Sequence, residues 1–253
     1  MRCVFLHGLA GEPEDFHGVR ALLPGWHTHA PEIDYFSGRF ESLEELADQV
    51  HAGLPAAFRD QPCLAVGNSL GGVLALVLAG RFERTILAGS HIELGTGFLG
   101  RGRGVLATEL ERIFHDPAAL SSERVARYEQ RWQEFAASRT LLRRLRPLKR
   151  MLQSFGDHQH YARGQERITL VCGASDRISP LGRCRELAVR YPRMGFEVLP
   201  ACGHAVPIEQ PRALARILEH AKKGGVPRKK CLQPDFGLDI VSSCTGGKCK
   251  ETC

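Results

Sequence analysis

The sequence predicts an α/β fold in which a mostly parallel sheet is flanked by helices and carries a helical cap insertion. Short apolar runs bounded by turn residues alternate with longer stretches of helical period, as expected for a parallel sheet covered by helices. This alternation stops over residues 93–164, an Arg-rich stretch of helical character without a convincing strand. The alternation then resumes and ends after residue 223, where a Lys-, Gly- and Cys-rich segment without clear periodicity begins.

The expected strands are short runs with Gly or Pro within the next two residues, at residues 3–6, 27–30, 64–66, 85–88, 168–172 and 196–199. Apolar residues at helical spacing predict the helices between and after them, at residues 14–22, 43–57, 70–81, 181–191 and 211–221. Ser42 with Glu45 three residues later is typical of a capping box at the start of the second helix. The elements therefore follow the order of a doubly covered parallel sheet.

This order divides the chain into three expected parts. Residues 1–92 and 165–223 hold every expected strand and form the core. Residues 93–164 are too many for a plain loop between two core strands, so we expect a cap with helices of its own. Residues 224–253 are expected to be a flexible tail, because their cysteines lie among Lys, Gly, Ser and Thr and lack apolar partners.

Composition and charge exclude several classes of protein. Of the 253 residues, 43% are hydrophobic, and the longest apolar run, residues 73–79, is far shorter than the roughly 18 residues of a membrane span. The first strand begins directly after Met1 and Arg2, so we expect a cytoplasmic protein with reduced thiols and no membrane partner. The net charge is 34 minus 28, or +6, and residues 221–253 supply +4 of it (seven minus three), which gives no case for a nucleic-acid surface.

A serine lies in a sharp turn between an expected strand and an expected helix. Residues 67–72 read Gly-Asn-Ser-Leu-Gly-Gly, with the strand 64–66 before them and the helix after them. This is the strand, turn and helix context of a G-x-S-x-G nucleophile elbow, in which small residues let strand and helix approach closely. A Gly-rich turn that merely contains a serine has the same motif. Ser69 is therefore a candidate nucleophile that needs further support.

A serine hydroxyl is a poor nucleophile at neutral pH and needs a base, with an acid that orients the base. Asp176 follows the expected strand at residues 168–172, and His204 follows the one at residues 196–199. The carboxyl ends of parallel strands meet at one edge, so we expect both side chains to lie near Ser69. An oxyanion hole would come from the backbone N–H groups of Leu70 and of Leu9, which lies in the glycine-containing loop after the first strand.

These four motifs, in this order, resemble the α/β-hydrolase superfamily over about residues 1–222. The resemblance implies that Ser69 is the nucleophile, His204 the general base and then acid, and Asp176 the orienting carboxylate. It further implies that the insertion covers the pocket and that no cofactor takes part. His7 is similar to the family's loop histidine, which is more often structural than catalytic.

The leading hypothesis is a serine hydrolase that cleaves a small ester or thioester through an acyl-enzyme. The Gly-Asn-Ser-x-Gly-Gly elbow also resembles that of carbon–carbon bond hydrolases, although the first loop lacks their Gly-Pro-Gly. A carbon–carbon bond hydrolase or an elimination enzyme on the same triad is therefore the first alternative. The second is a hydrolase-like scaffold for a thiol-rich metal-binding or redox tail.

Four further features of the sequence leave alternatives open. Glu93 is a second candidate for the triad acid. Asp157, His158 and His160 could reach a metal ion in a loop but not on one helix face. The basic run over residues 139–150 is either a solvated helix face or a rim that attracts an anionic substrate or partner. The tail thiols either have no chemistry of their own, or bind a soft metal ion or a protein partner; they are Cys231, Cys244, Cys249 and Cys253.

Overall fold

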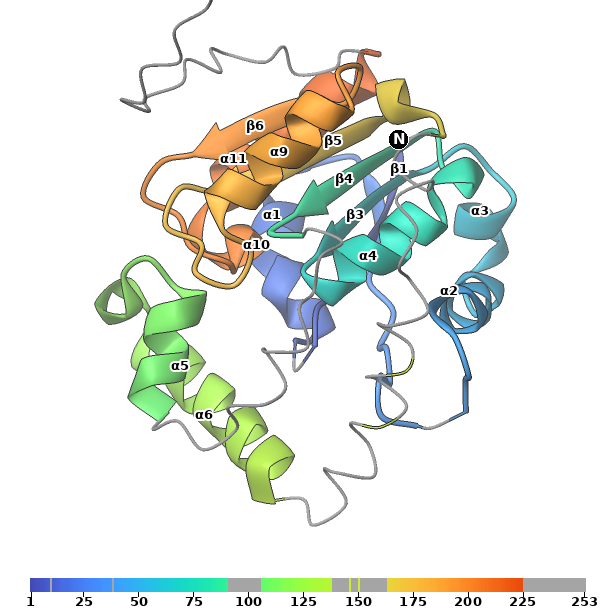
Figure 1. Ribbon diagram of the computed structural model, residues 1–253. Coiled ribbons are helices and arrows are strands. Elements are labelled where there is room, and N and C mark those ends of the chain that lie inside the picture. The colour runs from blue at the N-terminus through green and yellow to red at the C-terminus, as the bar shows by residue number, and fades with distance from the viewer. Residues whose placement is uncertain are drawn as a thin grey trace, which may run out of the picture.

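Six parallel strands form the centre of the chain in the computed structural model (Figure 1), which describes residues 1–9, 11–37, 39–90, 106–137, 146, 150 and 163–224. The strand order is β2-β1-β3-β4-β5-β6, and all five pairings are parallel. The strands are β1 Arg2–Leu6, β2 His27–His29, β3 Leu64–Asn68, β4 Arg84–Ala88, β5 Ile168–Gly173 and β6 Gly195–Leu199. The predicted α/β fold with a mostly parallel sheet is therefore confirmed.

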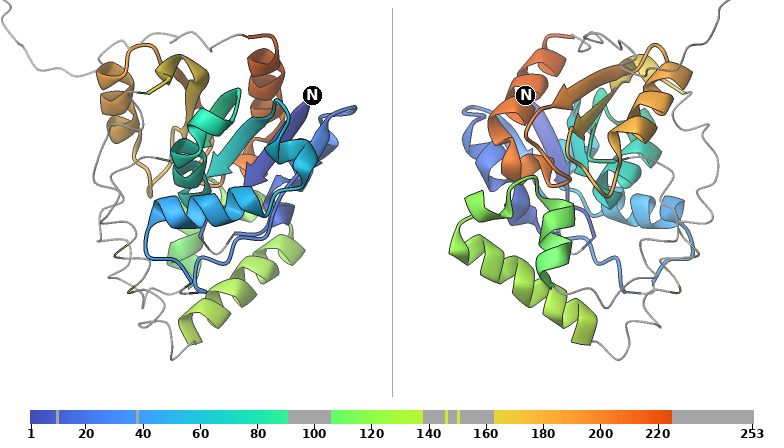
Figure 2. Two further views of the ribbon diagram at one scale, coloured as in Figure 1. Left: turned by 90° about the vertical axis from the view of Figure 1, so that its right-hand side faces the viewer. Right: turned by 60° about the vertical axis from the view of Figure 1, so that its left-hand side comes forward.

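Helices cover both faces of this sheet because alternate residues of each strand point to opposite faces. Val4 and Leu6 belong to one apolar core, and Cys3 and Phe5 belong to the other. The first core is closed by α2 Leu43–Ala52, α4 Leu70–Val77 and α9 Leu181–Arg190. The second is closed by α1 His17–Ala21, α10 Val206–Glu209 and α11 Pro211–Lys222. Figure 2 shows the same two helical layers from the sides.

Three predicted helices are shorter or more divided than expected. The one at residues 43–57 splits into α2 and α3 Ala56–Arg59, because Pro55 between them has no backbone N–H to continue the helix. The other two begin or end in 3₁₀ turns, η1 Pro13–Phe16 before α1 and η2 Ala79–Arg81 after α4. Ser42 does cap α2, since its hydroxyl accepts the Glu45 N–H at 3.1 Å. The Glu45 carboxylate accepts the N–H of Glu41 at 2.7 Å, so the described contacts complete only half of the expected capping box.

The described part of residues 93–164 contains helices α5 Leu106–Ile113 and α6 Ser122–Ala137, with η4 Pro117–Ala119 between them. Both helices lie beyond the carboxyl edge of the sheet, where Figures 1 and 2 show them in green. After them the chain returns to the sheet through η5 Gln165–Arg167, which leads into β5, and α11 is the last described helix. The described cap helices therefore stand at the edge where the predicted site lies.

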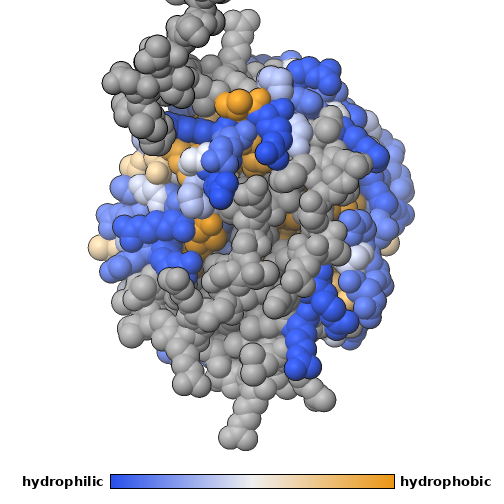
Figure 3. Space-filling view, in the orientation of Figure 1, coloured by the Kyte–Doolittle hydropathy of each residue, from blue (hydrophilic) through white to orange (hydrophobic). Residues whose placement is uncertain are grey.

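The described surface is mainly polar. Figure 3 shows predominantly hydrophilic side chains around the periphery of the view. Among the described residues, the large apolar side chains that are exposed are Leu22 and Val189. No helix within the described ranges has both the length and the apolar character needed to cross a bilayer.

Candidate active site

Ser69 occupies a strained turn between β3 and α4. Its φ of 54° and ψ of −124° lie outside the regions that residues with a Cβ prefer, at a cost of about 1–3 kcal/mol. The flanking glycines make this turn possible. A Cβ on Gly67 would lie 2.1 Å from the carbonyl oxygen of Gly71, and a Cβ on Gly71 would lie 2.1 Å from that of Leu6. The G-x-S-x-G spacing is therefore required by the packing of α4 against β3 and β1.

Backbone contacts hold Ser69 in place. Its N–H donates to the Ala88 carbonyl at 2.9 Å, and the Ser90 hydroxyl donates to the Ser69 carbonyl at 2.8 Å. The Ser69 side chain is partly exposed, and its hydroxyl forms no hydrogen bond with a described residue. A Cβ on Gly8 would lie 2.9 Å from the Cβ of Ser69, so the loop after β1 passes directly against the serine.

His204 and Asp176 form a buried hydrogen-bonded pair. Nδ1 of His204 lies 2.9 Å from Oδ2 of Asp176, and their side chains are 8% and 0% exposed. The other carboxylate oxygen of Asp176 accepts the N–H groups of Ile178 at 2.8 Å and Ser179 at 2.7 Å. Both oxygens therefore have partners that fix the carboxylate. Because a carboxylate only accepts, the proton lies on Nδ1, which leaves Nε2 available for proton transfer.

Gly89, at the carboxyl end of β4, brings this pair next to the serine turn. It follows Ala88, the acceptor of the Ser69 N–H, and adopts a positive φ of 56°. A Cβ on Gly89 would lie 2.6 Å from the carbonyl oxygen of His204, 3.3 Å from its Nδ1 and 3.5 Å from Oδ2 of Asp176. The Ser179 hydroxyl also donates to the Gly89 carbonyl at 2.9 Å. Gly89 thus contacts the Asp176 and His204 loops and directly follows the residue that binds the serine turn.

Asn68 adds a second link between the serine turn and the histidine loop. With its side-chain amide turned so that the nitrogen faces the acceptors, it donates to the carbonyl oxygens of His204 at 3.1 Å and Ala88 at 3.3 Å. Neither Asn68 nor Gly89 is among the site residues predicted from the sequence. The available indication of Gly89 in the sequence is its place directly after the expected strand at residues 85–88, the next strand after the elbow.

The two N–H groups predicted to form the oxyanion hole lie on the loops beside Ser69. Leu70 opens α4, and Leu9 lies in the turn that the Gly11 N–H closes on the Gly8 carbonyl at 3.0 Å. Neither N–H donates to a group within the described ranges. Both are therefore available to a substrate oxygen.

His7 supports this loop from beneath. Its Nδ1 donates to the Gly8 carbonyl at 2.9 Å, and its Nε2 accepts the Ile33 N–H at 3.0 Å. The Tyr35 hydroxyl donates to the His7 carbonyl at 2.5 Å. An Nε2 that accepts carries no proton, and burial lowers the pKa of His7, so the imidazole is neutral and its contact with Glu32 at 3.8 Å is no ion pair. The contacts of His7 are therefore those of a structural residue that holds the loop after β1 in place.

Helix α6 of the cap is tied to the end of the same loop. Nη2 of Arg131 lies 3.0 Å from the Glu12 carboxylate and 3.7 Å from that of Asp15. Asp15 in turn accepts the Glu12 N–H at 3.1 Å, and a Cβ on Gly11 would lie 2.9 Å from its Oδ2. The acidic pair thus joins the cap to the segment that carries Leu9.

Asp15 is expected to make stability depend on pH. Burial, the largest influence, raises its pKa from 3.8 to about 6, against the opposing charge of Arg131. A folded-state pKa above the unfolded value stabilises the fold fully below about pH 3.8, and this contribution is lost as pH rises through about 6. Asn does not titrate, so Asp15→Asn does not lose stability in this way. The free energy of unfolding of the variant minus that of the wild type should therefore rise by at most about 3 kcal/mol from pH 4 to pH 7.

Urea unfolding of the wild type and Asp15→Asn at three pH values measures this difference. Asp34→Asn, which removes an exposed carboxylate, controls for the change in net charge. If the free energy of unfolding of Asp15→Asn minus that of the wild type stayed constant or fell with rising pH, the ion pair with Arg131 would outweigh the effect of burial on the pKa of Asp15.

Several predicted residues lie outside the described ranges. These are Glu93, Asp157, His158 and His160, the four tail cysteines, and the basic run except Arg146 and Arg150, which are exposed. Within the described ranges, no group of three or more His, Cys, Asp or Glu side chains is arranged to hold a metal ion. The five described cysteines are all buried free thiols.

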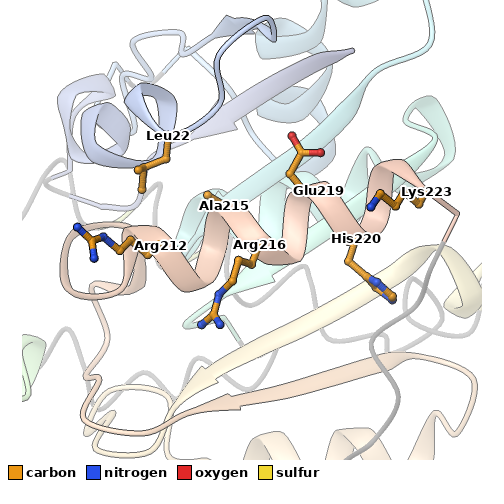
Figure 4. Close-up of a pocket in the computed structure, with 7 residues that line it drawn as sticks. All are labelled: Leu22, Arg212, Ala215, Arg216, Glu219, His220 and Lys223. Atoms are coloured by element: carbon orange, nitrogen blue, oxygen red, sulfur yellow. The ribbon is translucent and has the colours of Figure 1, made fainter.

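A surface depression of about 720 Å³ lies along α11, on the far side of the second core. Figure 4 shows Leu22, at the end of α1, reaching toward a helix face that carries Arg212, Arg216 and Lys223. None of Ser69, Asp176 and His204 lines it. This depression is therefore separate from the candidate active site.

Comparison with known proteins shows which protein family and which solved structures the chain is similar to. A family model described as "Alpha/beta hydrolase family" matches residues 3–217. A pimeloyl-[acyl-carrier protein] methyl ester esterase of Aromatoleum aromaticum is 26% identical over 87% of this chain and 98% of its own. Among solved structures, a meta-cleavage product hydrolase from Pseudomonas fluorescens IP01 has a TM-score of 0.71 at 20% identity, covering 89% of this chain and 92% of its own. A thermophilic esterase from Thermogutta terrifontis has a TM-score of 0.63 at 19% identity, covering 88% and 90%.

Proposed function

This chain belongs to the alpha/beta hydrolase family and is an enzyme of the hydrolase type, and we propose that it cleaves a small ester or thioester through an acyl-enzyme on Ser69. One observation carries the proposal. The buried pair of His204 and Asp176, 2.9 Å apart, packs against Gly89, and the preceding residue, Ala88, accepts the N–H of a serine held at positive φ. The esterase named among the relatives supports an ester as substrate.

In the proposed reaction, Nε2 of His204 takes the proton of the Ser69 hydroxyl as Oγ bonds to the substrate's acyl carbon. The N–H groups of Leu9 and Leu70 stabilise the oxyanion that forms. His204 then gives the proton to the leaving alcohol or thiol as its bond to the acyl carbon breaks. A water molecule, deprotonated by His204, attacks the acyl-enzyme, and His204 returns that proton to Oγ of Ser69 as the bond from Oγ to the acyl carbon breaks and the acid is released. Asp176 keeps the proton on Nδ1 and stabilises the imidazolium throughout.

Two measurements test this mechanism. A fluorophosphonate probe is expected to label Ser69, located by peptide mass spectrometry, because such probes react with an activated serine hydroxyl. Mixing with p-nitrophenyl butyrate is expected to give a burst of p-nitrophenol equal to the enzyme concentration if deacylation is slow. Labelling elsewhere with intact ester turnover would overturn the assignment of Ser69. Labelling without any ester or thioester turnover would favour carbon–carbon cleavage or elimination on the same triad.

The choice of Asp176 as the acid has a test of its own. Asp176→Asn keeps the shape of the side chain but lets the imidazole adopt the wrong tautomer, so kcat should fall by a factor on the order of 10³–10⁴. Glu93→Gln is the matched variant at the second candidate acid and is expected to leave kcat within about threefold. A silent Asp176→Asn together with a severe Glu93→Gln would show that the acid is Glu93.

A further inference from the structure

The loop that carries His204 is bound to the end of cap helix α5. The carbonyl oxygen of Ile113 accepts the N–H groups of His204 at 2.6 Å and Ala205 at 3.3 Å. A Cβ on Gly203 would lie 2.6 Å from that same oxygen, so glycine is needed for this approach. The buried ring of Phe114 packs against Ala205 beside these hydrogen bonds. The backbone on which the imidazole sits therefore depends on a segment far away in the sequence.

Glu209, at the end of α10, joins the two segments with its carboxylate. Oε2 accepts the Gly203 N–H at 2.8 Å, and Oε1 accepts the His115 N–H at 2.6 Å. Each oxygen thus binds one segment, the histidine loop on one side and the end of α5 on the other. Hydrogen bonds to an ionised carboxylate are among the stronger ones in proteins, which makes this bridge effective.

The Asp176 loop reaches the same cap segment. Nδ1 of His115 lies 2.8 Å from the hydroxyl of Ser175, the residue before Asp176. The segment 113–115 therefore contacts both loops that deliver the imidazole and its acid. Glu209 is the described side chain that bonds the backbone of this segment and the backbone of the histidine loop together.

We propose that Glu209 is a positioning residue: by bridging Gly203 and His115, it fixes the His204 imidazole relative to Ser69 and makes that geometry depend on the end of α5. This inference rests on the proposed function of the triad. Glu209 touches no reacting atom. Its effect arises because displacing a catalytic group by about 1 Å can lower a rate by about 10²-fold.

Glu209→Gln in the full chain tests the proposal. The amide has one accepting oxygen and presents its NH₂ group to the other N–H, so one of the two donors loses its acceptor. For p-nitrophenyl butyrate we expect kcat to fall at least about tenfold while KM changes less than about twofold, since Glu209 does not contact the acyl group. The rate at which a fluorophosphonate labels Ser69 should fall by the same factor, because labelling also requires His204 to take the proton.

Glu219→Gln is the matched control. Glu219 lies on the neighbouring helix α11, and its carboxylate accepts from Nε1 of Trp26 at 2.6 Å, away from the triad loops. This variant makes the same chemical change, but its remaining amide oxygen can still accept the single N–H of Trp26, so kcat and the labelling rate should be unchanged and the melting temperature should fall only slightly. If Glu209→Gln does not fold, Glu209→Asp, one methylene shorter, replaces it and is expected to show the same loss of kcat at unchanged KM.

A spectroscopic readout separates the failure of this inference from that of the proposed function. The ¹H NMR resonance of the proton between Nδ1 of His204 and Asp176 reports the imidazole position without any turnover. It should shift or broaden in Glu209→Gln and stay in place in Glu219→Gln. An unmoved resonance, or losses of kcat no larger than in the control, would overturn the role of Glu209. The proposed function alone would be overturned if the wild type neither hydrolysed esters nor reacted with the probe, while Glu209→Gln still shifted or broadened the resonance.

Discussion

Replacing Ser69 with Ala is expected to lower kcat/KM for p-nitrophenyl butyrate by a factor on the order of 10⁴ or more while the protein stays folded. Only the hydroxyl can form the acyl-enzyme, whereas the turn itself depends on the glycines around the serine. Ala carries a Cβ as Ser does, so the strained φ of 54° costs the variant as much as the wild type. Initial rates with both proteins, together with their melting temperatures, measure the two effects separately.

Ser42→Ala is the control for this substitution, and it should give the opposite result. The Ser42 hydroxyl caps α2 by accepting the Glu45 N–H at 3.1 Å, and loss of such a cap costs about 1 kcal/mol. We expect a lower melting temperature with unchanged kcat/KM.

His204→Ala should lose about as much activity as Ser69→Ala, and the double variant little more, because the two residues act as a unit. Retention of most wild-type activity in Ser69→Ala would end the proposal that this serine is the nucleophile.

The sequence carried enough information to predict the sheet and the three loops of the candidate triad. Each of Ser69, Asp176 and His204 lies in the loop after a short apolar strand, and parallel strands must bring their carboxyl ends to one edge. The buried contact between His204 and Asp176 agrees with that expectation, although their catalytic roles stay a prediction. The elbow needed no long-range information, because the glycines that permit it are its neighbours in the chain.

The contacts that join these loops could not be predicted in the same way. Glu209 lies on α10, a helix of four residues that is too short to show a periodicity. Its partner His115 is 94 positions away, and a single charged residue gives no indication of such a partner. The role of Gly89 likewise depends on the approach of His204 across the sheet edge. Chain-local patterns thus predict which residues lie at the edge, and long-range packing decides how those residues are held.

Gly71→Ala is the substitution with the largest expected effect on stability. Its Cβ would lie 2.1 Å from the carbonyl oxygen of Leu6 and 2.4 Å from that of His7, distances that real Cβ atoms do not show. Neither carbonyl can move easily. Leu6 pairs with Gly67 in the register of β1 and β3, and His7 holds the loop that passes Ser69. A shift of α4 by the required distance would instead break its packing against β3 and β4.

We therefore expect Gly71→Ala to lose more than about 4 kcal/mol of the free energy of unfolding, measured by urea unfolding, or to accumulate as insoluble protein. Gly182→Ala is the matched control, because Gly182 also lies in a helix, α9, and its added Cβ would have no atom within 4 Å. Removing a glycine from an open helix position stabilises by up to about 1 kcal/mol. The same chemical change should thus have opposite signs at the two sites. If Gly71→Ala were as stable as Gly182→Ala, α4 would not be pressed against the end of β1, and the geometry that holds Ser69 in its turn would have to be wrong.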